Sequence, residues 1–153
     1  MSLIIALGSN IGDSIQNLAD AKKELCHHFH LVAESRIYRS TAVDYENQPD
    51  FYNQVLQFDI PTNLTPGQSM DLCLEIEKKL GRTRQVLRGP RTIDIDIIFW
   101  ENAVINSNHI TIPHPRWQDR SFVVRPLSEL PFFQQISQWH KIPTSFTIEA
   151  FPV

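Results

Sequence analysis

One stretch of eight residues constrains the fold and the function of this chain more than any other. It runs Arg91-Thr-Ile-Asp94-Ile-Asp96-Ile-Ile, so two carboxylates stand two residues apart within a run of isoleucine. Successive side chains of a β-strand point to opposite faces, which puts Asp94 and Asp96 on one face, about 6.5 Å apart. Burying unpaired charge is costly, so the strand predicts cationic partners for its acidic face, either metal ions or clustered arginines.

Arginines are concentrated around this strand. Six of the nine in the chain fall in one region: Arg82, Arg84, Arg88, Arg91, Arg116 and Arg120. Their planar donors suit phosphate oxygens, and Mg²⁺ prefers one or two carboxylates together with substrate phosphates and water. The combination predicts a site for a magnesium-bound polyphosphate. Two simpler interpretations stay open, namely a solvated arginine loop and an edge strand with its acidic face in water.

Composition narrows the class of protein. With 153 residues, 42% hydrophobic and 20% charged, the chain is expected to form a single globular domain over residues 1–153. The net charge of −3 argues against a nucleic-acid partner, and the local arginine patch suits a small anion. No signal peptide is visible, and no apolar run approaches the length of a membrane span. We therefore expect a cytoplasmic monomer without a membrane partner, and we expect Cys26 and Cys73 to be buried free thiols.

Hydrophobic periodicity predicts alternating strands and helices. The best-marked helix begins at Thr65 as N-cap, has Pro66 and Gln68 in the first turn, and ends before Gly81. The remaining expected elements are strands over 3–7, 31–39 and 52–60, a helix over 15–29, a polar loop over 40–50, a hairpin within 103–112, a turn over 113–116 and a short helix over 122–130. The tail 131–153 has no clear period and receives no assignment. This order predicts an α+β sandwich whose mainly antiparallel sheet carries both long helices on one face.

Six motifs together resemble the 6-hydroxymethyl-7,8-dihydropterin pyrophosphokinase family of folate biosynthesis. They are Ala6-Leu-Gly-Ser-Asn, Tyr38-Arg-Ser, Gln48-Pro-Asp-Phe-Tyr-Asn53, Ile76-Glu-Lys-Lys-Leu-Gly-Arg82, Gly89-Pro-Arg-Thr-Ile-Asp-Ile-Asp96 and Pro113-His-Pro-Arg-Trp-Gln-Asp-Arg-Ser-Phe122. They occur in the family's order over about residues 3 to 130. The resemblance implies a ferredoxin-like βαββαβ sandwich with extra short helices. It also implies transfer of pyrophosphate from ATP to the pterin hydroxymethyl group, with AMP leaving.

The resemblance also implies residue roles. It makes Arg82, Arg91, Asp94 and Asp96 catalytic, with both aspartates holding two Mg²⁺ ions. The implied ATP-binding residues are Glu77, Arg84, Ile97, His109, Ile110, Thr111, His114, Arg116 and Arg120. The implied pterin-binding residues are Ser40, Thr41, Val43, Phe51, Asn53, Asp94 and Phe122.

Several alternatives accompany these assignments. Glu77 could instead be an exposed helix carboxylate, and Gly8 to Gly12 could be a strand-to-helix turn or a phosphate loop. The chain departs from the family's usual pattern at Ala42, Asp44 and Arg88, which bear on loop closure and pterin preference. A slow or substrate-shifted paralogue, a non-catalytic pterin- or nucleotide-binding module and a ferredoxin-like RNA-binding domain are the competing hypotheses.

Overall fold

An antiparallel sheet of six strands organises the fold. A computed structural model of the chain describes residues 1–41, 48–81 and 92–153. The strands run in the order β5 (Asp94–Trp100), β1 (Ser2–Ser9), β4 (Phe51–Asp59), β3 (Tyr38–Ser40) and β8 (Phe151–Pro152), while β2 (Leu31–Glu34) also pairs with β4. Every pairing in the sheet is antiparallel.

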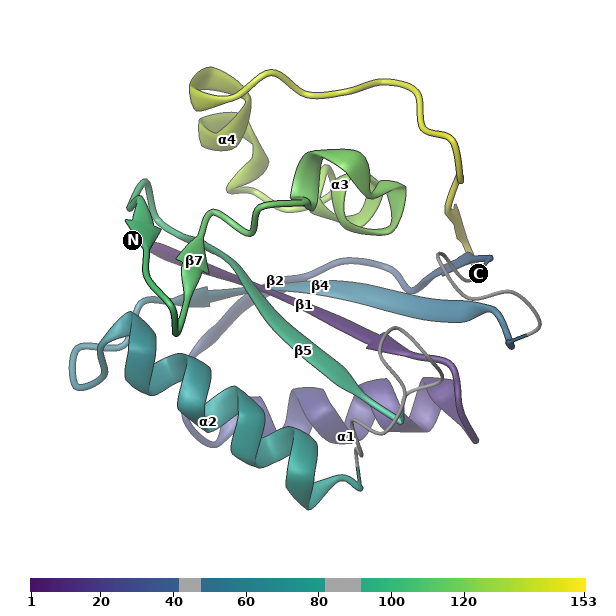
Figure 1. Ribbon diagram of the computed structural model, residues 1–153, viewed down its shortest axis with the longest axis horizontal. Helices are drawn as coiled ribbons and strands as arrows, with labels where there is room; N and C mark the ends of the chain where they lie inside the picture. Colours follow the sequence, from purple (N-terminus) through teal and green to yellow (C-terminus); the bar gives the residue numbers. More distant parts are fainter. Residues whose placement is uncertain (42–47, 82–91) are drawn as a thin grey trace.

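Two long helices cover one face of this sheet, as predicted (Figure 1). They are α1 (Ser14–Cys26) and α2 (Pro66–Lys79). The predicted capping box is present in α2, because Thr65 Oγ1 accepts from the Gln68 N–H at 3.1 Å and Gln68 Oε1 accepts from the Thr65 N–H at 3.0 Å. The apolar faces of both helices pack on Leu3, Ile5, Leu7, Ile95 and Ile97, which point to this side of the sheet.

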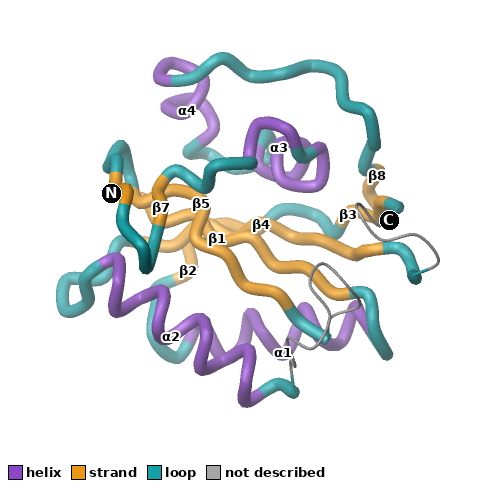
Figure 2. Tube along the Cα trace, viewed as in Figure 1, coloured by secondary structure: helices purple, strands orange, loops and turns teal. Residues whose placement is uncertain are grey.

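Shorter helices cover the opposite face (Figures 1 and 2). They are the 3₁₀ turn η1 (Trp117–Asp119), α3 (Ser121–Leu127) and α4 (Phe133–Trp139). These helices form a second apolar layer with Ile4, Val55, Ile98 and Phe99 of the sheet. The β1-α1-β2/β3-β4-α2-β5 core confirms the α+β, ferredoxin-like βαββαβ prediction.

The predicted strand over 31–39 is wrong in one respect, because it divides into β2 and β3. Ser35 lies between them, and its backbone N–H donates to the Val55 carbonyl at 3.0 Å. Its side chain takes the other half of this pairing, because Ser35 Oγ accepts from the Val55 N–H at 3.0 Å and donates to the Arg36 carbonyl at 2.7 Å. Gln54 Nε2 also donates to the Ser35 carbonyl at 2.8 Å. A serine that binds backbone groups locally interrupts a regular strand.

The shorter elements agree with their predictions, whereas the tail and one cysteine do not. The hairpin over 103–112 is confirmed by β6 (Ile105–Asn106) and β7 (Thr111–Ile112), and the helix over 122–130 by α3. The tail is more regular than predicted, since it contains α4 and β8. The prediction of a buried thiol is confirmed for Cys73 and wrong for Cys26. Cys26 is the last residue of α1 and is exposed, whereas the preceding Leu25 is the residue that points into the core. Among the described residues, no helix is long and apolar enough to cross a membrane.

Candidate active site

The sheet register aligns three predicted site positions across adjacent strands. Gly8 of β1 pairs with Asn53 of β4 on one side and with Asp94 of β5 on the other. In the next row, Ala6 pairs with Asp96. The neighbouring Ile95 is buried against α1 and α2, so Asp94 and Asp96 point to the α3 side, which confirms that the two carboxylates share a face.

Gly8 leaves space in the middle of this row. A methyl group at Gly8 would lie 2.8 Å from Asn53 Nδ2, closer than side chains normally approach, and 3.9 Å from Phe51 Cδ1. The absence of a side chain at Gly8 therefore allows Asn53 and Phe51 to lie over the β1 backbone. The sequence pattern around Gly8 indicated only a turn or a phosphate loop, because the contact with Asn53 depends on a strand that is distant in sequence.

Two buried polar atoms beside the row have no hydrogen-bond partner among the described residues. They are Ser40 Oγ and Asn53 Oδ1, on residues that are 4% and 7% exposed. Asn53 Nδ2 donates to the Leu7 carbonyl at 3.3 Å, which leaves Oδ1 as the unsatisfied end of the amide. Leaving buried polar atoms unsatisfied costs about 1–3 kcal/mol each, so both positions favour a ligand with hydrogen-bond donors.

Aromatic side chains flank this polar row from two elements. Phe51 lies on β4 opposite Ser40 of β3, and Phe122 lies on α3; both are half-buried. The Arg120 guanidinium lies 5.6 Å above the Phe122 ring. Predicted pterin and phosphate residues therefore meet at the start of α3. Thr41 follows Ser40 and is exposed.

His114 is held close to Asp94 and to the arginines of the η1 segment. Its Nδ1 accepts a hydrogen bond from the Arg116 N–H at 3.1 Å, so a neutral ring carries its proton on Nε2. Burial, followed by the positive charge of Arg120, lowers the pKa of His114 from 6.5 to about 4, while Asp94 opposes the shift. At neutral pH the ring is therefore an uncharged donor through Nε2.

Glu77 of α2 supports the acidic strand from behind. The side chain is buried, and Glu77 Oε2 accepts from the Ile95 N–H at 2.8 Å, between the two aspartates. The alternative of an exposed helix carboxylate is therefore wrong, because β5 covers this margin of the α2 apolar stripe. The contact fixes the backbone from which Asp94 and Asp96 project.

Four more of the predicted ATP-binding residues belong to β5 or to the segment around β7. Ile97 and Ile110 join the apolar cluster beneath α2. His109 Nε2 lies 2.8 Å from Asp71 Oδ1 and 3.3 Å from the Gly67 carbonyl, and Thr111 begins β7. Ile97 points to the face of β5 covered by α1 and α2, and the two aspartates point to the other, so the predicted residues lie on both faces of that strand.

Some predicted residues fall outside the described ranges: Val43, Arg82, Arg84 and Arg91, together with the family departures Ala42, Asp44 and Arg88. Across residues 1–41, 48–81 and 92–153, no group of three or more His, Cys, Asp or Glu side chains could hold a metal ion. Asp94 and Asp96 supply only two oxygen-bearing side chains. That donor set fits Mg²⁺, which completes its coordination with phosphate oxygens and water.

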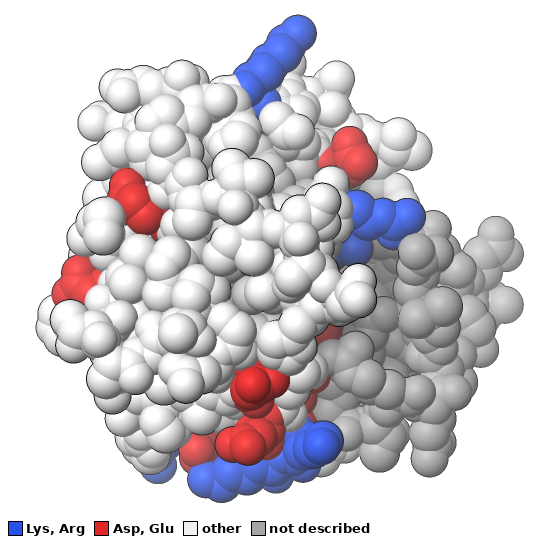
Figure 3. Space-filling view, turned by 60° about the vertical axis from the view of Figure 1, so that its left-hand side comes forward, with Lys and Arg blue, Asp and Glu red and all other residues white. Residues whose placement is uncertain are grey.

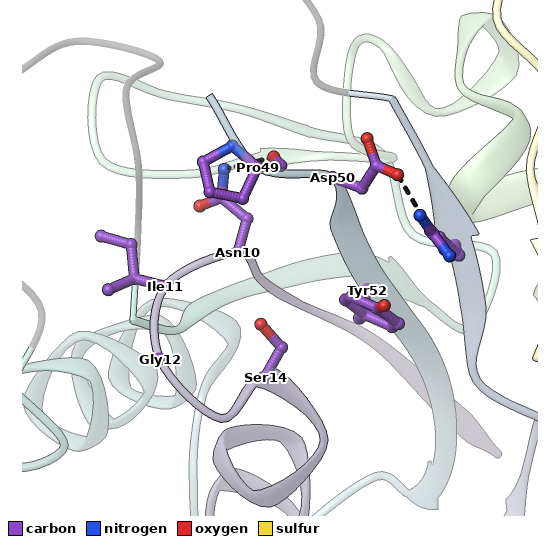
Figure 4. A pocket seen from close by; sticks show the side chains of 8 residues that line it. Asn10, Ile11, Gly12, Ser14, Pro49, Asp50 and Tyr52 are labelled. Carbon is purple, nitrogen blue, oxygen red and sulfur yellow. Dashed lines mark hydrogen bonds and ion pairs between the residues drawn. The ribbon is translucent and has the colours of Figure 1, made fainter. Parts of the chain in front are cut away.

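A pocket of about 480 Å³ lies around the β1–α1 turn (Figure 4). Asn10 Nδ2 spans this turn and the start of β4, donating to Gln48 Oε1 at 2.8 Å and to the Pro49 carbonyl at 3.1 Å. Tyr52 also lines the pocket, and it joins the α1 layer, on the opposite face of β4 from Phe51 and Asn53. The pocket is therefore separate from the polar row.

The β1–α1 segment itself is a strand-to-helix turn. Gly12 adopts a φ of 70°, and the helix N-terminus is capped by Asp13 Oδ1, which accepts from the Gln16 N–H at 3.1 Å. Because a carboxylate already occupies this N-terminus, the turn interpretation is favoured over a phosphate loop.

Surface charge in the described part is mixed in sign. On the face in Figure 3, basic side chains lie in separate groups, and those along the lower edge lie beside acidic ones. Two of the ion pairs are Lys22 Nζ to Glu34 Oε2 and Lys79 Nζ to Glu24 Oε2, both at 2.9 Å. The described residues of this face do not form the broad basic surface that an RNA-binding domain would need.

Comparisons with known proteins agree on one family. The family model described as 7,8-dihydro-6-hydroxymethylpterin-pyrophosphokinase (HPPK) matches residues 4–131. A Bacillus subtilis protein named 2-amino-4-hydroxy-6-hydroxymethyldihydropteridine pyrophosphokinase is 41% identical over 128 residues, which cover 82% of this chain and 75% of that protein. The Pneumocystis carinii folic acid synthesis protein fol1 is 39% identical over 130 residues, covering 84% of this chain. The chain spans only 17% of the length of fol1.

Solved structures support the fold. A crystal structure of an HPPK-DHPS protein in complex with substrates aligns with a TM-score of 0.60 at 12% identity, covering 84% of this chain and 40% of that one. The Plasmodium falciparum HPPK-DHPS wild type aligns with a TM-score of 0.57 at 13% identity, covering 84% and 39%. At this identity the likeness shows a shared fold.

Proposed function

Because the chain belongs to the 7,8-dihydro-6-hydroxymethylpterin-pyrophosphokinase family, we propose that it transfers pyrophosphate from ATP to 6-hydroxymethyl-7,8-dihydropterin, releasing AMP, in folate biosynthesis. The observation that carries this proposal is the row of Asn53, Gly8 and Asp94 across three strands. It joins a polar recognition surface to the acidic strand. A binding module without catalysis would not require the second carboxylate at Asp96.

The pterin end of the site is supported by unsatisfied hydrogen-bonding atoms. Ser40 Oγ and Asn53 Oδ1 are buried without partners in the described part of the chain, and a pterin edge offers N–H donors to both. Phe51 and Phe122 provide flat apolar surfaces against which the ring can stack. Thr41 and Val43 would complete this end from the β3 side.

The phosphate end combines carboxylates with cations. Asp94 and Asp96 would hold Mg²⁺, with two ions expected, and the metal would neutralise phosphate charge and fix phosphate geometry. Arg116 and Arg120, with Arg82, Arg84 and Arg91 from the neighbouring segment, would contact the triphosphate. His114 would donate from Nε2 to a phosphate oxygen, because its Nδ1 is occupied by the Arg116 N–H.

Catalysis in this arrangement rests on positioning and charge. The pterin hydroxymethyl oxygen attacks the β-phosphorus of ATP, and the bond to the departing AMP oxygen breaks. Arg82 and Arg91 would stabilise the charge that develops during transfer. Ile97, His109, Ile110 and Thr111 would surround the adenine, and Glu77 would hold the acidic strand through the Ile95 N–H. We further propose a single-domain, cytoplasmic monomer over residues 1–153.

One assay tests the proposal directly. The protein is incubated with ATP, Mg²⁺ and 6-hydroxymethyl-7,8-dihydropterin, and the nucleotide product is identified. We expect AMP together with pterin diphosphate; ADP would indicate an ordinary kinase. Ligand binding without any turnover would support the non-catalytic module instead.

A variant pair locates the metal site. Asp96→Asn is expected to lower turnover at least a hundredfold while the unfolding midpoint stays within a few degrees. Asp20→Asn, a change to a half-buried carboxylate on α1 that is bonded to Gln16, serves as the matched control and should leave turnover unchanged. Full turnover by Asp96→Asn would remove the metal role from Asp96.

A further inference from the structure

The chain beyond the family match is attached to α3, the helix that carries Phe122. Ser121 Oγ donates to the Ile148 carbonyl at 2.6 Å. One turn later, Arg125 donates to both carboxylate oxygens of Glu149 at 2.8 and 3.2 Å. Arg125 also donates to the Thr144 carbonyl at 2.9 Å, and its guanidinium lies 5.1 Å from the centre of the Phe146 ring. The tail is therefore bonded to α3 at its first residue, Ser121, and again one turn later at Arg125.

The same segment is attached to β3, the strand that carries Ser40. β8 pairs with β3 through Tyr38 opposite Pro152 and Arg39 opposite Phe151. The Val153 N–H also donates to the Ile37 carbonyl at 3.0 Å. Figure 2 shows the segment running from the end of α4, past α3, to the edge of the sheet, where β8 lies beside β3.

We propose that residues 141–153 position the pterin end of the site by joining α3 to β3, with Arg125 and Glu149 as positioning residues. This inference rests on the proposed function, because it concerns the same pterin. It adds a role for a segment that lies beyond residue 131, where the family match ends.

Geometry explains why such a connection matters. Phe122 directly follows Ser121, and Ser40 is the last residue of β3, a strand of only three residues. A strand as short as β3 contributes few ladder hydrogen bonds, so the added pairing with β8 helps to hold Ser40 in position. Ligand binding is sensitive to displacements of about 1 Å in the groups that contact it.

A purely stabilising role makes a different prediction. If the tail only buries apolar surface of the α3 layer, then weakening the attachment of the tail lowers the unfolding midpoint. The ratio of the KM for the pterin to the KM for ATP then stays unchanged. If it positions the pterin walls, the KM for the pterin rises more than the KM for ATP, which changes only as far as Arg120 at the start of α3 moves with Phe122. Of the residues proposed to bind ATP, Ile97 and Ile110 belong to the apolar cluster beneath α1 and α2, and His109 is bonded to Gly67 and Asp71. None of these three takes part in the hydrogen bonds described above that attach the tail to α3 and β3.

The test uses Glu149→Ala in the full-length protein, with Glu24→Ala as the matched control. Glu24 forms a comparable partly exposed ion pair with Lys79, between α1 and α2. We expect Glu149→Ala to raise the KM for the pterin three- to tenfold, with the KM for ATP and kcat within twofold and the unfolding midpoint nearly unchanged. Glu149→Gln keeps an acceptor for Arg125 and should recover part of the loss. Glu24→Ala should change none of these constants.

Two results would overturn the inference: an unchanged pterin KM in Glu149→Ala, or equal increases for pterin and ATP. Absence of turnover in the unaltered protein would instead refute the proposed function. Hydrogen exchange then tests the tail independently of activity. Glu149→Ala should speed exchange in both 36–41 and 120–124, and acceleration confined to 141–153 would show that the tail does not hold the two walls.

Discussion

Gly8→Ala gives the sharpest test of the polar row. The added methyl group would stand 2.8 Å from Asn53 Nδ2, whereas an ordinary contact at this position needs at least 3.4 Å. The backbone of Gly8 is part of β1 and can accept alanine, so the conflict falls on the Asn53 amide. That amide must move by about 0.6 Å or more, and its bond to the Leu7 carbonyl, at 3.3 Å, is the first to be lost.

The expected loss of pterin affinity can be estimated from the hydrogen bonds that the Asn53 amide would lose. Misplacing an amide that a buried ligand depends on costs about 1–3 kcal/mol, which corresponds to roughly 5- to 150-fold weaker pterin binding. Protein stability should change much less. Loss of the Leu7 bond costs about 1 kcal/mol, and replacing a strand glycine by alanine returns about 0.5–1 kcal/mol.

The assay measures pterin affinity by fluorescence titration, the KM for each substrate, and urea unfolding. Gly67→Ala is the matched control, since its methyl group would meet only His109 Cδ2, at an ordinary 3.5 Å. A double-mutant cycle then assigns the cause: if the effect acts through Asn53, Gly8→Ala adds little to Asn53→Ala. Additive losses in the cycle, or an equal loss of ATP affinity, would refute the reasoning.

Three more predictions follow from buried and half-buried groups. Glu77→Ala should lower the free energy of unfolding by about 1–3 kcal/mol in urea titrations, because the buried Ile95 N–H loses its acceptor, while exposed Glu75→Ala should have little effect. His114 stays neutral in the folded protein down to a pKa of about 4, whereas the unfolded chain takes up a proton near 6.5, so its contribution to stability is present above pH 6.5 and falls as the pH drops toward 4. The stability of the unaltered protein relative to His114→Gln should therefore decline by about 1 kcal/mol from pH 7 to pH 5, and a constant difference would contradict the shift. Burial raises the pKa of the Cys73 thiol to about 12, so iodoacetamide at pH 8 should label the folded protein at Cys26 alone and the unfolded protein at both cysteines, as counted by mass spectrometry.

Features of the structure that depend on a local residue pattern could be predicted from the sequence. Twofold alternation placed Asp94 and Asp96 on one face, and the Thr65 capping box marked the start of α2. These features depend on residues within a few positions of one another. The ferredoxin-like core followed from the order of such elements together with the family resemblance.

Contacts between distant segments could not be predicted in the same way. The row of Asn53, Gly8 and Asp94 depends on the pairing register of three strands. That register cannot be inferred from the residues near any one of these positions. The burial of Glu77 depends on β5 covering one margin of α2. The role of the tail was equally hidden, because Glu149 meets Arg125 only after the chain has passed across α3.

Strand register also determines which parts of this protein can be redesigned. A deletion of one residue in β1 would bring Leu7 or Ser9 to the place of Gly8, although both side chains belong with the α1 layer. Substitutions in the connecting loops would leave the alignment of the three strands in place. Libraries that seek a new ligand preference should therefore vary the loops and hold the length of β1 constant, since the register of β1 determines which residue lies between the recognition amide and the acidic strand.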